Sequence, residues 1–144
     1  MGYLANEILD VSSKLGYYTE LLSPSDTQKV FSAILEKFCH SNKSKPLPLW
    51  ELLENSIGIH NSEAWSWISE FVGKKPILIF FEQSDDSSIV YLKNGSFLSE
   101  ILGECFGFVF YITDLKYSYI ISFNDHDILI GSGTAANWIK SKSL

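Results

Sequence analysis

The chain has 144 residues, 46% of them hydrophobic, with 10 Phe, 7 Tyr and 4 Trp, so it can form one domain with a sizeable core and is neither disordered nor fibrous. It carries 11 lysines, no arginine and 17 acidic residues, for a formal net charge of −6. DNA and RNA binding gains affinity from cations that displace counterions, and arginine is the residue best suited to phosphate. The composition therefore disfavours nucleic-acid binding and suits a basic protein partner.

The first residues of the chain show no targeting signal. MGYLANEILDVSSKLGYY lacks the basic start and the long apolar run of a secretory signal, and Asn6 stands where a myristoylation signal has Ser or Thr. No segment has the roughly 18 consecutive apolar residues of a membrane-spanning helix. Cys39 and Cys105 allow one disulfide, but both are expected to be small buried hydrophobes. We expect a cytoplasmic protein without membrane contact.

The segment from the N-terminus to Phe38 is predicted to form two helices. An apolar stripe that includes Ile8 and Leu15 predicts a helix ending near Gly16. Ser23 is a typical N-cap residue, and Pro24 suits the first helical position. The helix that they begin has an apolar face made of Val30, Phe31, Ile34, Leu35 and Phe38.

A loop and two further helices are expected next. Two prolines in residues 41–48 predict the loop, and a short helix is expected around residues 50–55. Asn61 or Ser62 would cap the following helix, which ends at Gly73.

The second half of the chain changes to patterns that are typical of strands. The continuous apolar run at residues 77–81 predicts a strand covered on both faces, and residues 88–93 predict the returning strand after an acidic turn. Ser96 is expected to cap a helix that crosses the sheet. Residues 108–112 predict another apolar strand, and the alternation in residues 118–123 predicts a strand with one exposed face.

A last strand, residues 127–130, is expected after a two-residue turn at Asp125-His126, because Asp and His tolerate the left-handed backbone of such turns. All elements together predict one α+β domain over residues 1–144. Its N-terminal helices would pack on a mainly antiparallel sheet of about five strands, with a crossing helix and a short C-terminal helix.

The sequence GSGTAA at residues 131–136 has the glycine spacing of a dinucleotide-binding loop. Such a site also needs a second parallel strand and an acidic residue about 20 positions further on, but only eight residues follow. Gly131 and Gly133 are better explained as turn residues with positive φ, and Thr134 as the N-cap of the last helix. A small metal- or nucleotide-binding enzyme with its site at residues 124–134 remains an alternative function.

Asp125, His126 and Asp127 could also supply metal ligands. A catalytic metal site usually has three protein ligands from a defined pattern, and His40 and His60 lie in unrelated contexts. No set of residues has the spacing of a catalytic constellation. We therefore expect a protein that is not an enzyme and that binds no metal or other cofactor.

Acidic residues gather in the loops and strand ends of the second half, with aromatic residues close to them in sequence. Tyr and Trp are favoured interface anchors, and acidic groups around them attract a cationic partner. A solvated rim around a sheet would show the same pattern. The expected partner contacts are Glu82, Asp85, Asp86, Asp114, Tyr117, Asp125, His126 and Asp127.

Residues 106–140, FGFVFYITDLKYSYIISFNDHDILIGSGTAANWIK, carry a family resemblance. A strand ending in Tyr-x-Thr-Asp, a strand leading into Asn-Asp-His-Asp, the motif Ile-Gly-x-Gly and a short helix with Trp resemble small cytoplasmic immunity proteins of bacterial polymorphic-toxin and contact-dependent growth inhibition systems. The helical first half shows no comparable resemblance.

The resemblance implies a binding protein. Such immunity proteins bind a cognate toxin domain, often a nuclease with a basic substrate groove, and block its active site or its access to substrate. The toxin is encoded by a neighbouring gene. A third possible function is a regulatory domain that binds another protein through its helical half, residues 1–73, with Trp50, Trp65 and Trp67 as contacts.

Overall fold

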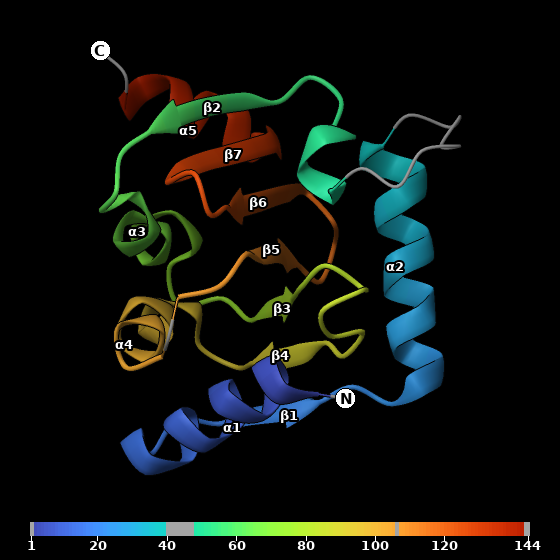
Figure 1. Ribbon diagram of the computed structural model, residues 1–144, viewed down its shortest axis with the longest axis vertical. Helices are drawn as coiled ribbons and strands as arrows, with labels where there is room; N and C mark the ends of the chain where they lie inside the picture. Colours follow the sequence, from blue (N-terminus) through green and yellow to red (C-terminus); the bar gives the residue numbers. More distant parts are fainter. Residues whose placement is uncertain (1, 40–47, 106, 143–144) are drawn as a thin grey trace.

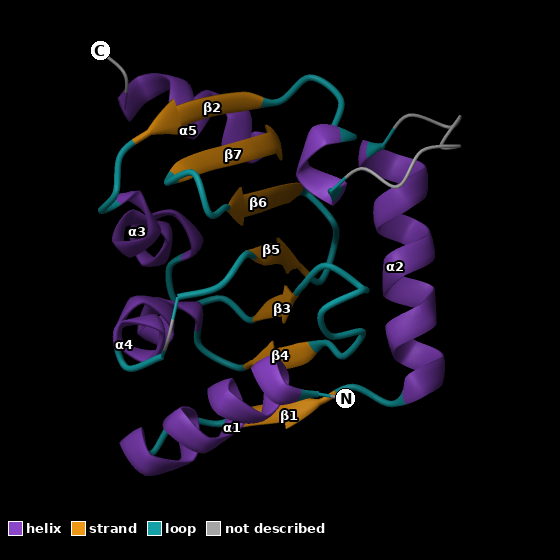
Figure 2. Ribbon diagram, in the orientation of Figure 1, coloured by secondary structure: helices purple, strands orange, loops and turns teal. Residues whose placement is uncertain are grey.

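A seven-stranded antiparallel sheet runs through the described part of the computed structural model, which comprises residues 2–39, 48–105 and 107–142. The strand order is β1-β4-β3-β5-β6-β7-β2 (Figure 1 and Figure 2). The strands are β1 (Thr19–Leu21), β2 (Ile57–His60), β3 (Ile77–Phe80), β4 (Val90–Leu92), β5 (Phe110–Asp114), β6 (Tyr119–Phe123) and β7 (Ile128–Gly133). The α-helices are α1 (Tyr3–Leu15), α2 (Pro24–Phe38), α3 (Ile68–Val72), α4 (Leu98–Gly103) and α5 (Thr134–Lys142).

Helices cover both faces of the sheet, and each face has its own hydrophobic core. One core joins the sheet to α1, α3, α4 and α5 through residues such as Ile8, Ile68 and Ile79. The other joins it to α2 through residues such as Ile34 and Phe80. Figure 1 shows α2 on one side of the sheet and both α3 and α4 on the other. The antiparallel α+β architecture expected from the sequence is thereby confirmed.

The central strands are largely apolar because both of their faces are covered. This confirms the prediction for β3, which is fully buried. The prediction for residues 118–123 was wrong, since every residue of β6 is buried and neither face is exposed. The serine at position 122 lies inside the protein instead of at its surface.

The predicted end of α1 and the predicted start of α2 are confirmed. Ser23 Oγ accepts a hydrogen bond from Asp26 N at 3.1 Å, with Pro24 as the first helical residue. Gly16 ends α1 in the left-handed conformation, at φ 84°. The predicted loop at residues 41–48 lies outside the described residues except for its last residue.

The later helices are shorter than predicted. The helix expected around residues 50–55 is a 3-10 turn at Leu49–Glu51. The helix expected up to Gly73 consists of a 3-10 turn, Ala64–Trp67, followed by α3. The crossing helix α4 is present, but a 3-10 turn, Gly95–Phe97, precedes it. Ser96 lies inside this turn, and the cap of the turn is Asn94, whose side chain accepts from Ser96 N.

The two strands that the sequence did not predict are the edge strands, β1 and β2. Among the described strands each of the two pairs with a single neighbour, and the residues of both are largely exposed. Strands of three and four residues are too short to show a clear apolar pattern. Both come from the first half of the chain, which therefore shares one sheet with the second half.

The segment from the last turn to α5 differs from the prediction in two respects. The turn between β6 and β7 spans residues 124–127, since Asn124 N donates to Ile128 O and Asp127 N to Asn124 O. Gly131 is a strand residue rather than a turn residue. A Cβ at Gly131 would lie 2.7 Å from Ile139 Cδ1 and 2.9 Å from Ala135 Cβ, so glycine lets α5 pack closely on β7. Gly133 does adopt positive φ, at 68°.

Candidate functional site

The two ends of the sheet differ in charge. At one end β3 and β6 finish and β5 and β7 begin. We call it the acidic end, because its loops contain Glu63, Glu82, Asp85, Asp86, Glu104, Asp125 and Asp127. The connections at the opposite end, which we call the basic end, contain Lys74, Lys75, Lys93 and Lys116, and Lys14 lies in the last turn of α1 at the same end.

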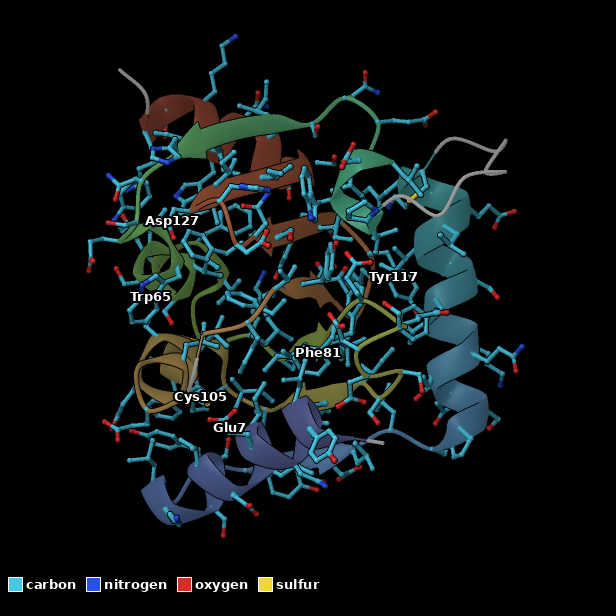
Figure 3. The ribbon with its side chains drawn as sticks, viewed as in Figure 1. Glu7, Trp65, Phe81, Cys105, Tyr117 and Asp127 are labelled. Atoms are coloured by element: carbon cyan, nitrogen blue, oxygen red, sulfur yellow. The ribbon has the colours of Figure 1, made fainter. Side chains whose placement is uncertain are left out.

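The structure divides the predicted partner contacts between these two ends. Residues 82–86 connect β3 to β4 and residues 125–127 connect β6 to β7, so both groups lie at the acidic end. Only β5 separates β3 from β6, which puts those two strands about 10 Å apart. Asp114 is the last residue of β5 and Tyr117 lies in the turn that follows it, both at the basic end, and Figure 3 shows Tyr117 far from Asp127. These two residues cannot share one surface with the rest.

Asp86 has an internal role. It is 2% exposed, and its carboxylate accepts hydrogen bonds from Ala5 N and Ser88 N, both at 2.9 Å. Because Ala5 lies in the first turn of α1, Asp86 caps the start of this helix. Burial raises the pKa of Asp86, but these hydrogen bonds outweigh it and the pKa lies below its ordinary value. Its oxygens are therefore occupied within the protein.

Glu82 is likewise bound inside the protein. Its oxygens accept from Leu49 N at 3.0 and 3.2 Å and from the hydroxyl of Tyr111. That hydroxyl accepts in turn from Trp50 N at 2.9 Å. Burial raises the pKa of Tyr111 and the adjacent carboxylate raises it further, so the hydroxyl stays protonated and donates. Glu82 thus holds the Leu49–Glu51 turn against the sheet.

The exposed predicted residues of the acidic end are Asp85, Asp125, His126 and Asp127. The side chains of Asp125 and His126 are 74% and 65% exposed. Asn124 shapes the turn, because its Oδ1 accepts from His126 N at 2.9 Å and from Ile128 N at 3.2 Å. Asp127 adopts the left-handed conformation, at φ 59°. The turn therefore presents its acidic side chains to solvent on a fixed backbone.

Two tryptophans from the first half lie beside this turn. The rings of Trp50 and His126 meet edge to face, with centroids 6.1 Å apart. Trp65 lines a cavity that is also lined by the acidic residues of the turn, Asp125 and Asp127, and Figure 3 shows Trp65, Cys105 and Asp127 on one side of the molecule. The cavity has a volume of about 490 Å³. Aromatic residues lining it include Trp65, Phe108, Phe110 and Phe123.

The cavity combines an apolar lining with negative charge. No lysine is among the described residues that line it, whereas Asp125 and Asp127 both do. Cys105 also lines it, and burial raises the pKa of its thiol to about 12, with further contributions from the negative charges of Glu7 and Glu104. Cys105 is half-buried rather than fully buried as predicted, while Cys39 is buried; the two form no disulfide.

This cavity is the concave feature that the sequence did not predict. Its aromatic lining comes from segments far apart in the chain. The sequence named Trp65 only as a contact of the helical half in the alternative of a regulatory domain. Among the described residues no three His, Cys, Asp or Glu side chains form a group that could hold a metal ion. His40 lies outside them. The close packing around Gly131 leaves its backbone no room for a phosphate group.

No protein-family model matches the chain, and neither a curated protein nor a solved structure matches it. Among the described helices, none combines the length and the apolar character that crossing a membrane requires.

Proposed function

We propose that the protein is an immunity protein, which binds a basic toxin domain through the acidic end of its sheet and blocks that domain's active site or substrate access. The observation that supports this most directly is that Asp85, Asp125 and Asp127 expose their carboxylates at the same end of the sheet. Asp125 and Asp127 also line an aromatic cavity there. Charged rims with aromatic anchors are typical of protein-binding surfaces.

The charge distribution favours one orientation of the complex. A basic toxin surface is attracted to the acidic end and repelled by the lysines of the basic end, since opposite fields steer encounter. A nuclease groove that binds nucleic acid must be positively charged. The acidic end would occupy such a groove in place of the nucleic acid.

The test is a pull-down of the tagged protein with the product of the adjacent open reading frame, together with a growth-rescue assay in cells that express this product. We expect a stable complex and rescue by the wild-type protein. Asp125→Lys should weaken both, because it reverses an exposed charge within the proposed surface. Glu36→Lys makes the same charge change on the exposed face of α2 and should leave both intact.

Two outcomes would overturn the proposal. One is the absence of any complex and any rescue with the neighbouring gene product. The other is equal weakening by Asp125→Lys and Glu36→Lys, which would indicate only an effect of net charge. A metal or nucleotide retained through purification, with turnover abolished by Asp127→Ala in the absence of a protein partner, would favour the alternative of an enzyme at residues 124–134.

A further inference from the structure

We propose that the cavity at the acidic end receives an arginine side chain of the partner, as the anchor of the complex. This inference rests on the proposed function for the identity of the partner, but the chemistry of the cavity can be tested without it. The cavity joins Trp65, the end of α4, residues 107–108 and the turn at residues 124–127.

The lining of the cavity fits the two parts of an arginine side chain. Leu102 and Phe110 are apolar and suit the aliphatic stem, which buries its methylene groups along apolar surface. Trp65 is half-buried and lines the same cavity. A guanidinium group stacks on the face of an indole ring, and tryptophan is the strongest partner for such a cation.

The polar atoms of the cavity fit the charged group and the peptide that carries it. Asp125 and Asp127 supply carboxylates, which bind guanidinium with two parallel hydrogen bonds. Asn124 is 2% exposed and lines the cavity, and its Nδ2 has no hydrogen-bond acceptor among the described residues. Because that nitrogen is buried, the amide must turn toward the cavity before a main-chain carbonyl of the partner can supply the acceptor.

Two other cations fit this lining less well. A lysine ammonium lacks the planar fork and stacks less well on a ring. A divalent metal ion prefers several oxygen ligands in a polar shell, and no group of three suitable ligands occurs among the described residues. The combination of aromatic lining and paired carboxylates therefore indicates a guanidinium group.

The test is an NMR titration of the free protein with an N-acetyl-arginine amide, compared with the citrulline analogue, which has nearly the same shape without the charge. We expect the indole N–H resonance of Trp65 to shift in a saturable manner with arginine and much less with citrulline. The lysine analogue should bind more weakly than arginine. Spectra of Trp65→Leu and Trp67→Leu assign the resonance.

Matched variants separate the cavity from general charge effects. Asp127→Asn should raise the dissociation constant of the arginine amide about two- to fivefold, whereas Glu36→Gln removes one charge far from the cavity and should not change it. Trp65→Leu should abolish the saturable shifts of the cavity residues. Trp67→Leu is the control, because Trp67 lies in the same 3-10 turn and does not line the cavity.

Equal shifts with arginine and citrulline, or shifts that persist in Trp65→Leu, would overturn the inference. The proposed function fails separately, through the pull-down and rescue assays. Arginine binding in the cavity without any toxin binding would support the inference and overturn the proposed function. Rescue that is insensitive to Trp65→Leu would support immunity and overturn the arginine anchor.

Discussion

At the scale of single residues, the carboxylates of the acidic end serve two different purposes. Asp85 and Asp125 are exposed, whereas Asp86 accepts hydrogen bonds from two backbone N–H groups in the interior. A buried carboxylate of this kind stabilises the fold because its removal leaves donors without an acceptor. Asp85 and Asp86 are neighbours in the chain, so substitutions at these two positions allow a direct comparison of the two environments.

We predict that Asp86→Asn lowers the free energy of unfolding by about 1–2 kcal/mol at neutral pH, because it weakens the cap of α1 and removes a negative charge at its start. Urea denaturation measures this change. Asp85→Asn is the matched control and should change stability by less than about 0.5 kcal/mol.

We also predict that the difference in stability between the wild-type protein and Asp86→Asn depends on pH. The pKa of Asp86 is lower in the folded protein than its ordinary value of 3.8. Its carboxylate therefore contributes its full stabilisation at any pH above 3.8. The stabilisation is lost as the pH falls through the folded pKa. The difference between wild type and Asp86→Asn should therefore shrink in the acid range, and a difference that stays constant there would contradict the assigned role.

At the scale of elements, the packing of α5 on β7 depends on the absence of a side chain at Gly131. Ile139 and Ala135 occupy the space that a Cβ at Gly131 would take. Ile139 is fully buried in the core on this face. The strand and the helix that follows it are thereby held at close approach, immediately after the turn that carries the exposed acidic residues.

We predict that Gly131→Ala destabilises the protein by about 1–3 kcal/mol through overpacking, as measured by denaturant unfolding. Gly107→Ala is the control, since a Cβ there would meet nothing within 4 Å. Ile139→Val removes the atom closest to the new methyl group, Cδ1. The double variant Gly131→Ala with Ile139→Val should therefore be less destabilised than the sum of the single changes. Additive effects would show that Ile139 is not the obstacle.

At the scale of the whole molecule, charge is separated along the strand direction. Lysines gather at the basic end and exposed carboxylates at the acidic end. Each connection between strands places its residues at one end only, so a sequence with modest net charge can fold into a molecule with two opposite poles. Such a field orients a charged partner before contact.

We predict that the association rate with the basic partner falls as salt is raised from about 0.15 M to about 1 M, since the Debye length falls from about 8 to about 3 Å. Asp85→Lys should lower the association rate about two- to tenfold at low salt, with a smaller effect on dissociation. Surface plasmon resonance measures both rates. Glu36→Lys is the control, and a rate independent of salt would contradict steering by the acidic end.

The first helices and the central strands could be predicted from the sequence because their signals are local. Ser23 and Pro24 define the start of α2 within four residues of chain, and the uninterrupted apolar run of β3 indicates burial on both faces. The edge strands β1 and β2 carry no such signal, since one of their sides meets solvent. The alternation in β6 predicted an exposed face that does not exist. A small serine is tolerated in a covered layer, so a polar residue in the pattern did not indicate exposure.

By itself, the sequence determined the α+β class, the end of α1, the start of α2 and the gathering of acidic residues in the turns of the second half. Tertiary structure alone decided which of these carboxylates are internal, because Asp86 meets Ala5 across 81 positions of the chain. It also decided that Trp65 from the first half shares a cavity with Asp127 from the second. The physical reason is that periodicity and capping act within a few residues of the chain, whereas burial and charge environment depend on contacts between distant segments.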